Sequence, residues 1–114
     1  MKETKFGELS DEIVYNYLDR LIGAVYKCLP MKEKNDETLD KYLESLLREL
    51  NGNKELIYEL KNDALFLKLL GTLTGLKAID DLEHYKSDVF KSINLIKKIK
   101  QKHFVDLLQS NFSQ

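Results

Sequence analysis

Apolar side chains recur every three to four residues along most of the chain, and strict alternation of apolar and polar residues extends over no useful length. The first spacing is typical of amphipathic α-helices and the second of β-strands. One proline and five glycines are the only strong interruptions. The pattern therefore predicts an all-α protein without a β-sheet, with residues 1–114 forming a single helical domain.

Capping and breaking residues mark the first two expected helices. Ser10 suits the N-cap of a helix over about 11–29, which Pro30 should stop, because the residue before a proline avoids the helical region. A second helix is expected over about 37–50. It should end at Asn51-Gly52, since glycine accepts the left-handed backbone that closes many helices.

The second half of the chain predicts two more helices. Asn53 can cap a third helix from about residue 54, with a break at Asn62-Asp63 and continuation over 64–76. A last helix should open at Asp80-Asp81 and reach Gln101 or Leu108. Short connections favour a four- to five-helix antiparallel bundle. Residues 1–9 are expected to form a loose arm and residues 109–114 a frayed end.

Two of these segments, the first helix and residues 64–76, are apolar around most of their circumference. A helix that is apolar on all sides should be buried on all sides, and a four-helix monomer has no central helix. We therefore expect a second copy of the chain to cover the surplus in a homodimer, with contacts that include Tyr15, Leu18, Ile22 and Tyr26. The alternative is a five- or six-helix arrangement with breaks at Asn62 and Gly75, wrapped around one central helix.

Composition narrows the class of protein. Hydrophobic residues make up 43% and charged residues 32%, which suits a globular fold better than a disordered chain or a membrane protein. The net charge of −1 creates no global attraction to nucleic acid or to an anionic membrane. The single cysteine, Cys28, and a charged N-terminal stretch without an apolar signal core favour a cytoplasmic protein that does not enter the membrane.

Little in the sequence indicates catalysis. His84 has Asp80 and Asp88 at helical spacing, but one histidine among carboxylates favours local charge pairing over a metal site. Cys28 lies on the apolar side of its helix and should behave as a small hydrophobe. We therefore predict no enzyme, no catalytic, cofactor-binding or metal-binding residues, and no cofactor. The pair Gly71 and Gly75 is expected to let a neighbouring helix approach closely.

The last helix carries a basic stripe. His84, Lys91, Lys98 and Lys102 lie within roughly 40° of one another at 100° per residue. Six lysines and one acid occur over 86–103, whereas nine acids and five bases occur over 33–63. The lysines could bind nucleic-acid phosphates, or the stripe could be a solvated face that pairs with the acidic helix beside it. Because arginine is absent from the stripe, we favour the solvated face.

The favoured function is a non-enzymatic helical protein–protein interaction module, self-associating and with an unknown protein partner. The alternative is a nucleic-acid-binding accessory protein that uses Lys91, Lys98 and Lys102.

Overall fold

The computed structural model describes residues 2–4, 7–9, 11–56 and 58–103, and the side chains within 12–54 and 60–102. The helices of these residues, in chain order, are α1 (Asp11–Tyr26), α2 (Cys28–Glu33), α3 (Leu39–Leu56), α4 (Tyr58–Lys61), α5 (Ala64–Gly75), the short 3₁₀ helix η1 (Leu76–Ala78) and α6 (Leu82–His103). The prediction of an all-α bundle is confirmed. The predicted frayed end, residues 109–114, lies outside the described residues.

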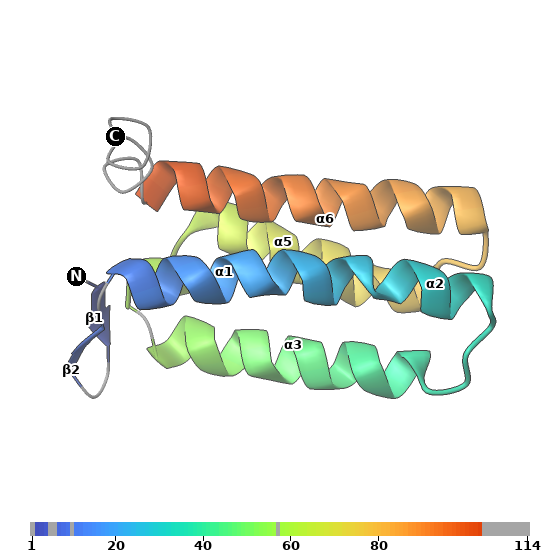
Figure 1. Cartoon of the computed structure of the whole chain (residues 1–114), viewed down its shortest axis with the longest axis horizontal. Coiled ribbons are helices and arrows are strands. Elements are labelled where there is room, and N and C mark those ends of the chain that lie inside the picture. The colour runs from blue at the N-terminus through green and yellow to red at the C-terminus, as the bar shows by residue number, and fades with distance from the viewer. Residues whose placement is uncertain (1, 5–6, 10, 57, 104–114) are drawn as a thin grey trace.

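Proline does not stop the first helical run where the sequence predicted. Pro30 lies in the first turn of α2, where a missing N–H leaves no intrahelical hydrogen bond unmade. Its effect falls four residues earlier, because a proline ring clashes with the carbonyl at i−4, which here is Tyr26, the last residue of α1. The run therefore breaks at Lys27, and α2 continues roughly along the direction of α1 (Figure 1).

Glycine does not end α3 either. Asn51 and Gly52 lie inside this helix, which runs on to Leu56, and the Asn51 side chain donates a hydrogen bond to the Leu47 carbonyl at 2.9 Å. The start of α3 at Leu39 lies within two residues of the predicted start at about residue 37. The Asp36 carboxylate accepts hydrogen bonds from the Thr38 hydroxyl and backbone, which lower the pKa of Asp36 and form the turn before the helix.

The predicted break before residue 64 is confirmed. Asp63 is the N-cap of α5, and its Oδ1 accepts hydrogen bonds from the backbone of Leu65 and Phe66 at 2.8 and 3.1 Å. The second predicted break also occurs, since α5 ends at Gly75 and passes into η1. Asp81 caps the start of α6 through a 2.9 Å bond from the backbone of His84.

Residues 1–9 were expected to form a loose arm, and the absence of any β-sheet was expected as well. Both expectations are wrong at this end of the chain. Strands β1 (Lys2–Thr4) and β2 (Gly7–Leu9) pair in antiparallel register, with Lys2 opposite Leu9 and Thr4 opposite Gly7, and β1 packs against α4. Three-residue strands are too short for their alternation to be visible in sequence.

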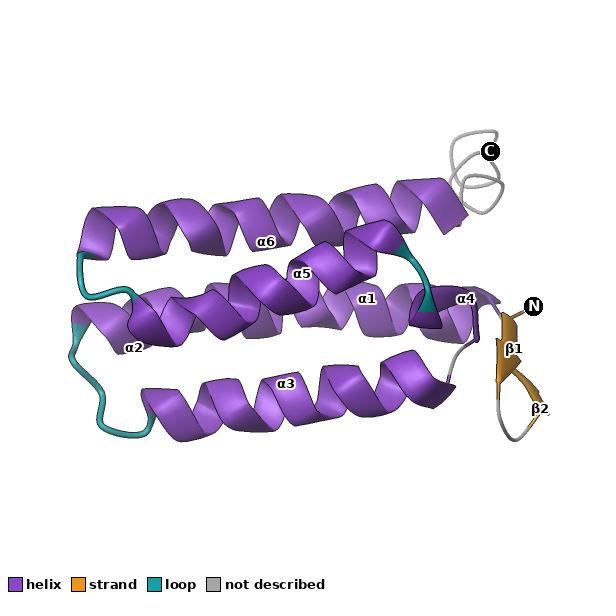
Figure 2. Cartoon of the chain, turned by 180° about the vertical axis from the view of Figure 1, so that it is seen from behind, coloured by secondary structure: helices purple, strands orange, loops and turns teal. Residues whose placement is uncertain are grey.

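The long helices lie side by side and alternate in direction, with α5 and α1 packed against α6 and α5 also packed against α3 (Figures 1 and 2). The core between them holds one apolar row from each helix. Its fully covered members include Leu18, Leu43, Phe66, Leu73 and Ile96. A hydrogen bond of 2.6 Å from the Tyr42 hydroxyl to the Ala24 carbonyl joins α3 to α1.

Candidate functional site

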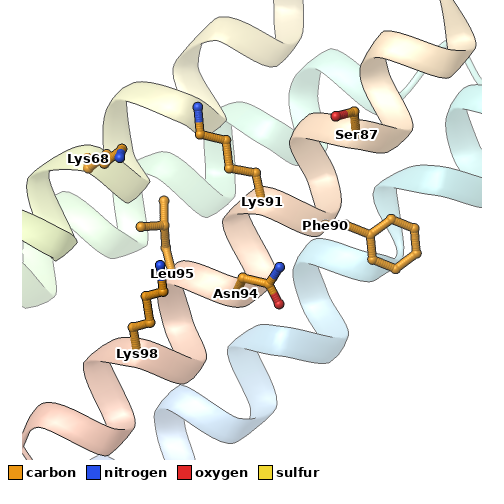
Figure 3. Close-up of a pocket in the computed structure, with 7 residues that line it drawn as sticks. All are labelled: Lys68, Ser87, Phe90, Lys91, Asn94, Leu95 and Lys98. Carbon is orange, nitrogen blue, oxygen red and sulfur yellow. The ribbon is translucent and has the colours of Figure 1, made fainter.

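An open groove of about 440 Å³ lies along the outer side of α6 where it meets α5, and Figure 3 shows the side chains around it. Its lining consists of one residue from α5 and six from α6: Lys68, Ser87, Phe90, Lys91, Asn94, Leu95 and Lys98. Three of the seven are lysines, two are neutral hydrogen-bonding groups, and none is an acid. The groove is therefore a concave surface of positive charge with donors beside it.

Helical periodicity explains how α6 builds most of this groove. Ser87, Lys91, Asn94 and Lys98 follow one another at intervals of four, three and four residues, which places them in a single row along the helix. At 1.5 Å per residue this row covers about 16 Å. The core residues of α6 point the other way, so the row is exposed to solvent along its whole length.

The groove lysines differ from three other lysines of the bundle in forming no ion pair among the described residues. Elsewhere Lys77 lies 2.8 Å from Glu44, Lys100 lies 2.7 Å from Asp19, and Lys102 lies 3.0 Å from Asp63. Within the described part of the chain, Lys68, Lys91 and Lys98 form no ion pair. Their charge is available to a ligand.

The groove includes two of the three lysines predicted for phosphate binding, Lys91 and Lys98, and adds Lys68, which was not predicted. Lys102 shares the stripe of Lys91 and Lys98 by spacing, but its ammonium is committed to the side chain of Asp63, which is 1% exposed. Lys68 was missed because it stands in an apolar stretch on another helix. Only the packing of α5 against α6 brings Lys68 to the groove. Figure 3 shows it on α5, across the groove from Lys91 of α6.

The four residues predicted for a dimer interface do not form one surface. Leu18 is 0% exposed and belongs to the core of the single chain, so its assignment to an interface is wrong. Tyr15 and Ile22 are half-buried, and the Lys100 ammonium lies 4.4 Å from the centre of the Tyr15 ring. Only Tyr26, at 52% exposure, is largely on the surface.

The dimer prediction was based on apolar surface that a single chain could not cover. The exposed part of that surface is also smaller than the sequence indicated. α5 is covered by α6 on one side and α3 on the other, which leaves Leu67 as the only large apolar side chain exposed among the described residues of this helix. On α1 the exposed large apolar residues are Ile13 and Tyr26, at opposite ends of the helix. Ile13 thus lies apart from Tyr26, whereas Tyr26 contacts the exposed ring of Phe90 on α6. Neither makes the continuous apolar face along α1 that the dimer requires, and self-association stays a prediction.

Gly71 and Gly75 do not receive a neighbouring helix. A Cβ atom added at either position would meet nothing within 4 Å, so no described segment of the chain approaches them. The expectation that this pair allows close helix packing within the chain is therefore wrong. Both residues lie on the solvent side of α5.

The buried side chains that could act as nucleophiles are held in their protonated, unreactive forms. Cys28 is fully buried, and burial raises the pKa of its thiol to about 11, which keeps it protonated at neutral pH. Burial also raises the pKa of Tyr85, whose buried hydroxyl lies beside the Cys28 thiol. His84 is exposed, with Nε2 3.8 Å from Asp88. Over the described residues, no group of three or more His, Cys, Asp or Glu side chains could hold a metal ion.

A second, smaller hollow of about 130 Å³ lies between α1 and α3, lined by residues that include Tyr17, Arg20 and Glu49. Its two charged groups have opposite signs, and burial raises the pKa of the Tyr17 phenol. It offers a ligand neither the volume nor the single sign of charge found at the α5–α6 groove.

No described helix is both long and apolar enough to cross a membrane. Comparison with protein families, curated proteins and solved structures gives no match to this chain. The α5–α6 groove is therefore interpreted from its own chemistry.

Proposed function

We propose that the protein is a non-enzymatic, nucleic-acid-binding accessory protein that holds backbone phosphates in the α5–α6 groove. The observation that carries this proposal is the convergence of Lys68, Lys91 and Lys98, from two helices, on one concave surface without an acid. Lysine binds phosphate as a point charge, and the Ser87 hydroxyl and Asn94 amide add neutral donors. Without arginine forks in the groove, binding should depend little on base sequence.

A protein partner, the function favoured by the sequence, fits the groove less well. Lysine is depleted in protein–protein interfaces, whereas aromatic residues and arginine are enriched. The apolar surplus that favoured a protein partner is largely buried within the single chain. Clustered lysines without ion pairs, by contrast, can neutralise backbone phosphates and release their counterions.

The test is binding of fluorescently labelled oligonucleotides at low salt, followed by anisotropy. Three phosphate contacts should give a slope of about −2 when the logarithm of the binding constant is plotted against that of salt concentration. Changing Lys68, Lys91 and Lys98 together to Gln should weaken binding at least 10-fold and flatten the slope. Because the three side chains are exposed, the fold should be retained, which circular dichroism checks.

A matched variant controls for net charge. Changing Lys34, Lys41 and Arg48 to Gln removes the same formal charge from exposed positions away from the groove. This variant should bind within about twofold of the wild type. Equal losses in both triple variants, or no binding by the wild-type protein at low salt, would overturn the proposal.

A further inference from the structure

The groove contains an aromatic side chain that phosphate binding does not explain. Phe90 lines it and is 41% exposed, although phenylalanine is among the residues most often found inside proteins. It precedes Lys91 directly and lies one helical turn before Asn94, so its ring stands beside the row of donors. Figure 3 shows Phe90 pointing toward α1, on the side of α6 opposite Lys68.

A second exposed aromatic residue fixes the position of this ring. Tyr26 at the end of α1 is 52% exposed, and its ring centre lies 6.2 Å from that of Phe90 at an interplanar angle of 65°. In such an edge-to-face pair one ring presents an edge and the other a face. Each ring therefore keeps at least one face outside the contact. The pair is a partly rigid aromatic platform at the edge of the lysine groove.

We infer that the ligand of this groove is single-stranded DNA or RNA, with a base stacked on Phe90 and the adjoining phosphates on Lys91, Lys98 and Lys68. A positively charged groove beside exposed aromatic side chains is the usual arrangement for single-stranded nucleic acids. In a duplex the base faces are covered by their neighbours in the stack, so Phe90 would have nothing to stack on. This inference rests on the proposed function and names its substrate class.

The discriminating experiment compares labelled dT12 and U12 with a 12-base-pair duplex. The wild-type protein should bind both single strands more tightly than the duplex at the same salt concentration. Phe90→Leu keeps an apolar side chain but removes the aromatic face, and should weaken single-strand binding roughly 5- to 100-fold. It should leave duplex binding within about twofold. A difference between dT12 and U12 would identify which strand chemistry is preferred.

A second variant gives a direct signal for stacking. The chain contains no tryptophan, so Phe90→Trp introduces a single one at the platform. Stacked bases should quench its fluorescence as dT12 is added, with affinity retained within about threefold. Leu82→Trp, at a position 43% exposed near the start of α6, is the matched control and should not be quenched.

The outcomes separate the two proposals. If the lysine variant loses binding but Phe90→Leu does not, and the duplex binds as well as dT12, the single-strand inference is rejected while phosphate binding stands. If neither nucleic acid binds, the proposed function fails as well. Poly-L-glutamate serves as the probe for an acidic protein partner. Binding of this polymer as tight as that of dT12, and equally dependent on Phe90, would overturn both.

Discussion

Lysines on the two sides of α6 have different roles. On the side that faces α1, Lys100 is only 12% exposed, lies 2.7 Å from Asp19 and covers the ring of Tyr15. On the outer side, Lys91 and Lys98 are exposed and form no ion pair among the described residues. Spacing along a helix therefore identifies a lysine row, but the neighbouring helix decides whether each lysine is structural or available to a ligand.

The sharpest contrast between the inner and outer sides should be chemical accessibility. Cys28 packs inside the bundle near Tyr85 of α6, and burial raises the pKa of its thiol from 9.0 to about 11. At pH 8 this shift alone lowers the thiolate fraction roughly 100-fold. Iodoacetamide should therefore label the folded protein at least about 100-fold more slowly than the protein in urea, as followed by mass spectrometry. Similar rates in both conditions would show that the inner side is open.

The same raised pKa predicts a loss of stability in alkali. Below pH 9 the Cys28 thiol is protonated in both states, and its contribution to stability is fully present. As the pH rises from 9 to about 11, the unfolded chain ionises first, so the free energy of unfolding should fall. Cys28→Ala should reduce that fall in urea titrations at successive pH values. An unchanged pH profile would mean that the thiol is not responsible.

The next largest effect should come from Asp63, on the structural side of the comparison. Asp63→Ala removes both hydrogen bonds to the first backbone N–H groups of α5 and removes the carboxylate that pairs with Lys102. Loss of such a cap alone costs about 0.5–2 kcal/mol of stability, which urea unfolding can measure. Lys102→Gln is the control. It should cost less than Asp63→Ala and leave dT12 binding within about twofold, whereas a large loss of binding would return Lys102 to the ligand site.

A smaller effect of opposite sign is expected at Gly71, on the solvent side of α5. An added Cβ meets nothing there, and alanine is favoured over glycine inside a helix by about 0.5–1 kcal/mol. Gly71→Ala should therefore raise the melting temperature by a few degrees in a thermal scan. A decrease would mean that another molecule or segment packs on this face.

The smallest effect on stability should come from the outer lysines themselves. Lys91→Gln removes an exposed charge without an ion pair, so the free energy of unfolding should change by no more than about 0.5 kcal/mol. The same substitution should still weaken oligonucleotide binding and lower the salt slope by about 0.7. If Lys91→Gln destabilised the protein, Lys91 would contribute to the fold as Lys100 does, and the lysines on the two sides of α6 would not differ in role.

Local signals predicted most helix positions but not every boundary. Asp63 and Asp81 were recognised as caps because a carboxylate before an apolar run satisfies free backbone N–H groups whatever surrounds it. Pro30 and Gly52 were misplaced as helix ends. The first is compatible with an opening turn, and the second lies in a helix that continues despite glycine's weak propensity.

Only the part of the site that lies on one helix could be predicted from the sequence. Periodicity alone placed Lys91 and Lys98 on one face. It could not exclude Lys102, whose partner Asp63 is 39 residues away, and could not include Lys68, which arrives from α5. Phe90 is absent from the predicted site because sequence does not show which apolar positions a small bundle leaves uncovered.

The packing of α1 against α6 has a consequence for biosynthesis. The Lys100–Asp19 bond joins residues 81 positions apart, and α6 is the last described helix in the chain. At about 5–20 residues per second, the ribosome needs several seconds to make the intervening chain. During that time the row Val14, Leu18, Leu21 and Val25 has no α6 to cover it. The nascent chain must therefore keep an apolar helix from aggregating until its last partner is synthesised.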